Sequence, residues 1–117
     1  MAITRGRLVE IQTIPSTVGS LYANSASTIT FVKGLTLFNS NTTTEVVKLY
    51  RVPDSTGSLG TAAVTNQFLE ISLAALETFV FEFPGDGAVL EDTNDSIQGV
   101  TTTASKVTVQ IHGVKDV

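Results

Sequence analysis

The sequence KVTVQIHGV, at residues 106–114, shows most clearly what kind of fold the chain adopts. Val107, Val109 and Ile111 occupy alternate positions, and polar residues stand between them. Successive side chains of a β-strand point to opposite faces of a sheet, so this period of two predicts a strand with one buried face. We therefore expect an antiparallel strand that packs its apolar face against a core.

The same alternation recurs along the chain. The sequence ETFVFEF places Phe79, Phe81 and Phe83 on one face, which we interpret as core rather than as a binding platform. Further strands are predicted at residues 45–52 and 67–73, and weaker ones at 5–11, 20–24 and 95–102.

The sequence STITFVKGLTLFN predicts a longer strand in which Lys33 interrupts the pattern. One face is expected to carry Ile29, Phe31, Leu35 and Leu37. The opposite face is expected to carry Thr30, Val32, Thr36 and Phe38.

Between these runs lie segments with turn chemistry, such as NSNTTT, FPGDGA and EDTND. The sequence SLAALET fits either one or two helical turns or a strand–turn–strand unit. About eight short strands joined by polar turns predict an all-β fold, a single antiparallel β-sandwich of jelly-roll type. We expect one domain over residues 1–117, with residues 1–12 as an N-terminal arm or edge strand.

The longest break is the connector RVPDSTGSLGTAAVTNQ, which exceeds a tight hairpin loop. Its length would let it cross from one sheet to the other, as Greek-key connections do. Asp54 is the only ionisable residue between the two flanking strands, so we interpret the segment as a connector or contact loop.

The composition excludes several classes of protein. The chain has no cysteine, which rules out disulfides, thiolate metal sites and a cysteine nucleophile. The net charge is −4 without a run of Lys or Arg, so no nucleic-acid partner is expected. No apolar stretch approaches the roughly 20 residues of a membrane span, and no secretory signal is recognisable. We expect synthesis in the cytoplasm and no membrane partner.

Only 15% of residues are charged, which favours a protein that covers part of its surface with other subunits.

The residues that could do chemistry are few. His112 is the only histidine and no GxSxG motif is present, so we interpret His112 as solvated or at an interface. A glycosidase would need two neighbouring carboxylates, for which Glu10, Glu70 and Glu82 are the strand-borne candidates. No catalytic residue and no cofactor is predicted.

The acidic sequence LEDTNDS leaves two interpretations open. Glu91, Asp92, Asn94 and Asp95 offer the hard oxygen ligands that calcium prefers. The spacing lacks the pattern of an EF-hand, and a solvent-facing turn before the next strand explains the same residues. We predict no metal site.

Two long phrases resemble the small β-sandwich capsid decoration (cement) proteins of tailed bacteriophages. They are TITFVKGLTLFNSNTTTEVVKLYRVPDSTGS and FLEISLAALETFVFEFPGDGAVLEDTNDSIQGVTTTASKVTVQIHGV, which together span residues 28–114. Leu76 replaces the usual glycine of that pattern, and EDTNDSI is longer than the usual segment. Both departures fall in expected turns.

The resemblance implies a non-enzymatic structural virion protein, a homotrimer that binds the outer capsid surface and stabilises contacts between major capsid protein subunits. The alternatives are a small tail or fibre protein and a carbohydrate-binding β-sandwich module. Candidate contacts with the capsid or with other subunits are Arg5, Arg7, Pro53, Asp54, Ser55 and Gly57. For the two arginines, simple solvation is the competing interpretation.

Overall fold

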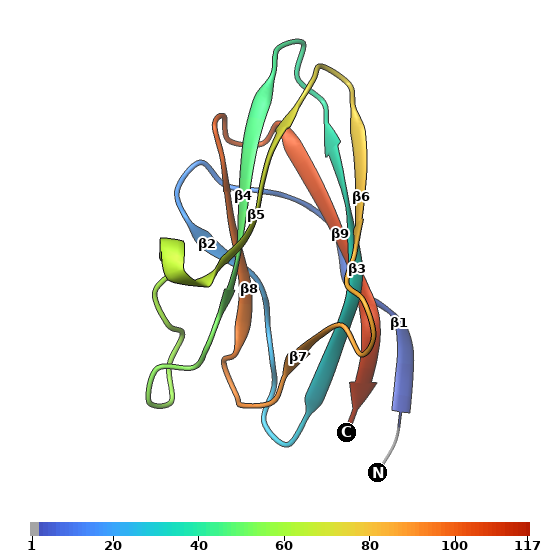
Figure 1. Ribbon diagram of the computed structural model, residues 1–117, viewed down its shortest axis with the longest axis vertical. Helices are drawn as coiled ribbons and strands as arrows, with labels where there is room; N and C mark the ends of the chain where they lie inside the picture. Colours follow the sequence, from blue (N-terminus) through green and yellow to red (C-terminus); the bar gives the residue numbers. More distant parts are fainter. Residues whose placement is uncertain (1–2) are drawn as a thin grey trace.

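The computed structural model describes residues 3–117, except for the side chains of Thr4 and Arg5. In this range the chain forms two antiparallel sheets that face each other (Figure 1). One sheet contains β1 (Ile3–Thr13), β3 (Ile29–Asn39), β6 (Thr78–Glu82), β7 (Ala88–Leu90) and β9 (Val107–Asp116). The other contains β2 (Gly19–Ala23), β4 (Glu45–Val52), β5 (Gln67–Leu73) and β8 (Ser96–Thr101).

The strand order is that of a jelly roll. The sheets read β1-β9-β3-β6 and β2-β8-β4-β5, so the first strand pairs with the last, the second with β8, and β4 with β5. Strands β6 and β7 both pair with β3, one after the other, and together act as one interrupted strand. The predicted all-β sandwich of jelly-roll type is therefore confirmed.

Strand β3 contains a β-bulge that reverses the expected orientation of its first half. Its pairing with β9 slips at Lys33, which is the extra residue of the bulge. An inserted residue inverts the alternation on one side of it. Thr30 and Val32 are accordingly fully buried, whereas Ile29 is 38% exposed. The prediction that Ile29 and Phe31 share one face with Leu35 and Leu37 is wrong.

Two connections also differ from expectation. The connector after β4 does not cross between sheets, because β4 and β5 are hydrogen-bonded neighbours in the same sheet. It is a long hairpin loop that includes one 3-10 turn, η1 (Val64–Asn66). The short strand β7 was not predicted, since it has only three residues and directly follows the PGDG turn.

The sequence SLAALET forms strand, turn and strand rather than helix. Strand β5 ends at Leu73 and β6 begins at Thr78, and Leu76 adopts a left-handed conformation with φ of 60° between them. No described residue lies in a helix long and apolar enough to cross a membrane.

The core lies between the two sheets and consists almost entirely of aliphatic side chains. Phe68, Phe81 and Phe83 form a cluster on the side where β5 and β6 meet, with ring centroids 4.9–5.8 Å apart. With Phe79 they pack against the core while remaining partly exposed, so they line the edge of the core rather than its centre. The fully buried aliphatic residues include Ile14, Val32, Leu35, Leu37, Val47, Leu49, Leu73, Leu90, Ile97 and Ile111.

Candidate functional site: the loop after strand β4

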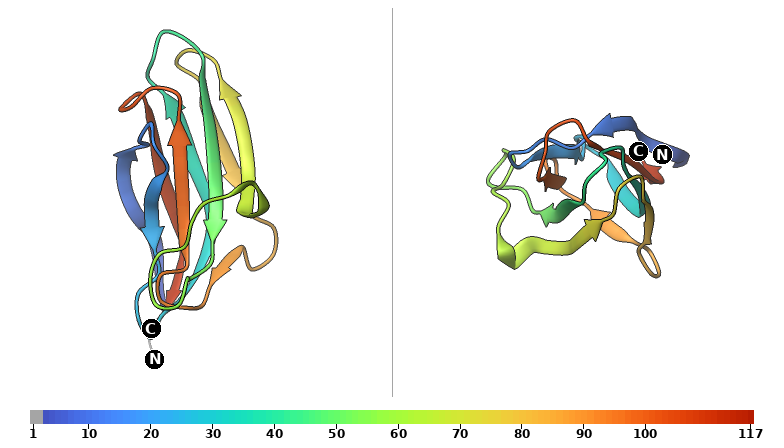
Figure 2. Two further views of the ribbon diagram at one scale, coloured as in Figure 1. Left: turned by 90° about the vertical axis from the view of Figure 1, so that its left-hand side faces the viewer. Right: turned by 90° about the horizontal axis from the view of Figure 1, so that it is seen from above.

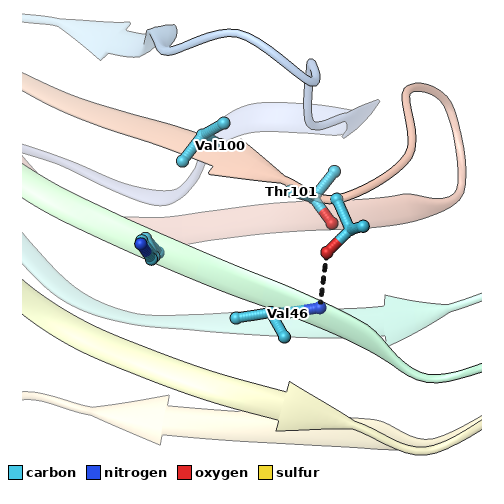
Figure 3. A pocket seen from close by; sticks show the side chains of 5 residues that line it. Val46, Val100 and Thr101 are labelled. Atoms are coloured by element: carbon cyan, nitrogen blue, oxygen red, sulfur yellow. Dashed lines mark hydrogen bonds between the residues drawn. The ribbon is translucent and has the colours of Figure 1, made fainter.

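A shallow hollow on the surface has no catalytic equipment. It measures about 240 Å³ and lies on the outer face of β4 and β8, between Val46, Lys48, Val100, Thr101 and Thr102 (Figure 3). The Val46 amide donates a hydrogen bond to the Thr102 hydroxyl at 3.2 Å, so this hydroxyl already has a partner within the protein. Ligand pockets usually reach about 300–1,000 Å³ and contain several convergent polar groups. One lysine beside valines and threonines offers no acid–base pair and no activated nucleophile.

The other candidate chemical groups are dispersed. Glu10 and Glu82 lie on the two edge strands of one sheet, and Glu70 lies on the other sheet. His112 lies across Gly34, where an added Cβ would come within 3.0 Å of the imidazole. Among residues 3–117, no three His, Cys, Asp or Glu side chains gather as metal ligands would.

In the acidic turn before β8, Asp95 acts as a structural acceptor. One carboxylate oxygen accepts the amides of Glu91 and Asp92 at 3.1 and 3.0 Å. The other accepts the amide of Asp54 at 2.7 Å. Because both oxygens of this buried side chain point at backbone N–H groups, they are directed away from solvent and a cation. The geometry favours the turn interpretation over calcium binding.

The same bond from Asp54 to Asp95 fixes the start of the loop after β4. The Asp54 carboxylate accepts the amide of Gly57 at 3.1 Å, closing a tight turn. Ser55 and Ser58 then exchange two backbone hydrogen bonds, at 2.9 and 3.2 Å. The result is a miniature hairpin that projects from the end of the sandwich.

The tip of this hairpin is strained. Thr56 and Gly57 have φ of 51° and 90°, the signature of a type I′ turn. Asn-Gly is the favoured pair for such a turn, and a β-branched residue at positive φ is an outlier. Thr56 is exposed to solvent, so no buried contact explains why a threonine occupies this position.

The second half of the loop folds back over the outer face of the β4–β8 sheet. Gly60 lies so close to this sheet that an added Cβ would be 2.4 Å from the Pro53 carbonyl oxygen and 2.8 Å from Val52. Gln98 donates its side-chain amide to the Gly60 carbonyl at 3.1 Å. Gln98 is consequently 5% exposed, although it lies on an outer face. The loop is therefore an ordered part of the fold with an exposed tip.

The predicted contact residues occupy two separate places. Pro53, Asp54, Ser55 and Gly57 lie together in the loop, whereas Arg7 lies on the edge strand β1 of the other sheet. Arg7 pairs with Glu10 at 3.1 Å, and its side chain is 53% exposed. The side chain of Arg5 lies outside the described part of the structure.

Glu45 is a buried carboxylate that the sequence did not reveal. It is 1% exposed and accepts hydrogen bonds from the Thr103 amide, the Asn41 side chain and the Thr101 hydroxyl, at 2.8, 2.9 and 3.0 Å. Burial raises the pKa of Glu45, but these hydrogen bonds lower it by more, so the pKa lies below its ordinary value of 4.5. Every donor serves the fold, which makes Glu45 a structural residue.

Comparison with known proteins identifies the fold but no family. No family model and no curated protein matches the sequence. Among solved structures, a protein of Bacillus endospore appendages, described as a novel family of disulfide-linked pili, matches with a TM-score of 0.52 and 17% sequence identity. The match covers 97% of this chain and 86% of that chain. A likeness at this identity shows a shared fold, in that case carried by a structural pilus protein.

Proposed function

We propose that this chain is a non-enzymatic structural protein of a virion, which decorates the outer capsid surface and stabilises contacts between major capsid protein subunits. The sequence resemblance supplies the class, and the proposal includes its homotrimeric state. Catalysis is not part of it, because the described side chains offer a shallow hollow with one lysine and dispersed carboxylates.

The observation that carries the proposal is the exposed, strained tip of the loop after β4. Backbone strain persists only where the surroundings hold it, and it concentrates at functional positions. Here Asp95, Asn94 and Gln98 hold the loop, the Asn94 side chain donating to the Gly57 carbonyl at 3.0 Å. A rigid tip loses little entropy when it binds, as an adhesive contact requires.

A fibre or tail subunit is the second candidate. The similarity to a pilus protein favours this candidate, since the similar fold of that protein forms part of a filament. A disulfide linkage between subunits is impossible for this chain, which has no cysteine. Any filament would depend on non-covalent contacts.

Co-sedimentation of the purified protein with separated phage heads and tails tests these roles. Saturable binding to heads, at hundreds of copies per particle, is the expected result. Binding to tails at a few copies would replace the first candidate with the second, and binding to neither would refute both.

A further inference from the structure

The two flanks of the sandwich differ in chemistry. Strands β1 and β2 run along one flank, and β5 and β6 run along the other (Figure 2). On the second flank the ring of Phe68 meets those of Phe81 and Phe83 across the two sheets. We call the second the β5/β6 flank, and the exposed side of Ile3–Thr13 the β1 edge.

The β5/β6 flank is where the core is least covered. Most of the partly exposed hydrophobic residues that pack on the core lie there, and Val80 on the outer side of β6 is 54% exposed. The partly exposed members on these strands, and on the residue directly after β6, are Phe68, Leu69, Ile71, Phe79, Phe81 and Phe83. Exposed apolar side chains gathered around a cluster of touching rings are typical of an interaction site.

This apolar strip is bordered by negative charge. Glu70 on β5 and Glu82 on β6 are exposed, and Glu77 lies exposed in the turn between the two strands. Lys48 on β4 lies opposite Glu70, and Lys33 donates to the Gly85 carbonyl.

The β1 edge carries an exposed cation and exposed apolar side chains, together with Glu10, which pairs with Arg7 at 3.1 Å. Arg7 is 53% exposed there, between Ile3 and Ile11, which are 65% and 64% exposed. Arg7 and Glu82 lie in the same transverse row of the sheet, since Arg7 pairs with His112, His112 with Gly34, and Gly34 with Glu82. One row thus ends in a cation at one edge and in an anion at the other.

We propose that the β5/β6 flank of one copy binds the β1 edge of a second copy, with Arg7 facing Glu82. A contact between two different patches is heterologous, and it closes into a ring if the rotation between subunits allows. The inference rests on the proposed function, because it names the contact that would form the trimer. With about 800 Å² buried per partner in each of two contacts, the ring would cover about a quarter of the 6169 Å² surface.

Charge reversal tests the contact in the purified full-length protein. Sedimentation velocity should give three times the 12.4 kDa mass of one chain. Arg7→Glu and Glu82→Arg should each weaken association on the order of tenfold or more. The double variant Arg7→Glu/Glu82→Arg should restore it, because each contact then has both charges again.

Matched controls separate this contact from a general effect of charge. Lys106→Glu and Glu91→Arg make the same changes in exposed turns at the ends of the sandwich and should leave association unchanged. Circular dichroism and melting temperature verify that each variant is folded. A monomeric wild-type protein, or association that survives both single reversals, would overturn the inference.

A crosslink gives a second, independent measurement. Because the chain has no cysteine, Arg7→Cys/Glu82→Cys introduces the only thiols, and oxidation should join separate copies into closed trimers. Arg7→Cys alone should give no crosslinked dimer. Head binding by a monomeric protein would refute this contact and the homotrimeric state, and would leave the capsid-decorating role. Trimers that bind no heads would support the contact and refute that role.

Discussion

Leu76 has a backbone conformation that is unfavourable for a leucine. Its φ of 60° belongs to the left-handed region, and its side chain is 63% exposed, so packing recovers little of the cost. We expect Leu76→Gly to raise the free energy of unfolding by about 0.5–1 kcal/mol, as measured by urea denaturation. Leu76→Ala, which keeps a Cβ, should give no such gain. A loss of stability in Leu76→Gly would mean that the leucine side chain has a packing role.

Glu45 ties stability to pH. Its pKa is below 4.5 in the folded chain, so the folded state binds its proton less readily than the unfolded state. The ionised carboxylate therefore stabilises the fold above the unfolded pKa, and this contribution is lost as the pH falls through the folded pKa. Glu45→Gln should lower stability at neutral pH by about 1–2 kcal/mol, since the new amide cannot accept from Asn41.

Melting temperature as a function of pH checks this assignment. The wild-type curve should fall below pH 4.5 more steeply than the curve of Glu45→Gln. Glu91→Gln, in an exposed turn, serves as the control and should follow the wild type. Parallel curves for wild type and Glu45→Gln would show that another carboxyl group controls the acid transition.

The loop after β4 depends on a side chain from a different connection. Asp95 holds the Asp54 amide and two amides of its own turn, and asparagine would replace one acceptor oxygen by a donor. Asp95→Asn should cost about 1–3 kcal/mol of stability. It should also speed hydrogen exchange at the Asp54 amide, while amides in the centre of β9 stay protected. Unchanged exchange at Asp54 would contradict the anchoring role.

The strands could be predicted from sequence because burial of one face imposes a period of two. Residues 45–52 and 67–73 were predicted as strands with the bounds that β4 and β5 have. The bulge at Lys33 could not be predicted, since it depends on the pairing of β3 with β9. The path of the connector after β4 could not be predicted either, because it depends on which strand pairs with β4, and local sequence does not determine that pairing.

The candidate site was predicted only in part, for a related reason. Pro53, Asp54, Ser55 and Gly57 were recognisable as a loop from their turn chemistry. What orders this loop lies some forty residues away, in the turn before β8, and a sequence pattern does not show it. The role of Glu45 was missed for the same reason. Two of its three hydrogen-bond donors are Thr101, the last residue of β8, and Thr103, which follows that strand.

The loop tip and the β5/β6 flank are separate surfaces, so attachment to a capsid and contact between copies should be separable by mutation. Thr56→Asn/Leu59→Ser changes the side chains of the loop tip and keeps the type I′ turn, since Asn-Gly favours that turn. We expect this variant to remain trimeric and to lose binding to phage heads.

Arg7→Glu should behave differently, because in the proposed trimer it weakens the contact between copies and leaves each loop intact. Three linked loops that engage one surface gain affinity from their high effective concentration, on the order of 10²–10⁴-fold. The monomeric variant should therefore bind heads with the weaker intrinsic affinity of one loop, measured by co-sedimentation over a range of concentrations. Equal affinities for the trimer and the monomer would show that only one loop of each ring reaches the shell, whereas loss of binding in Arg7→Glu alone would place the capsid contact on the β1 edge.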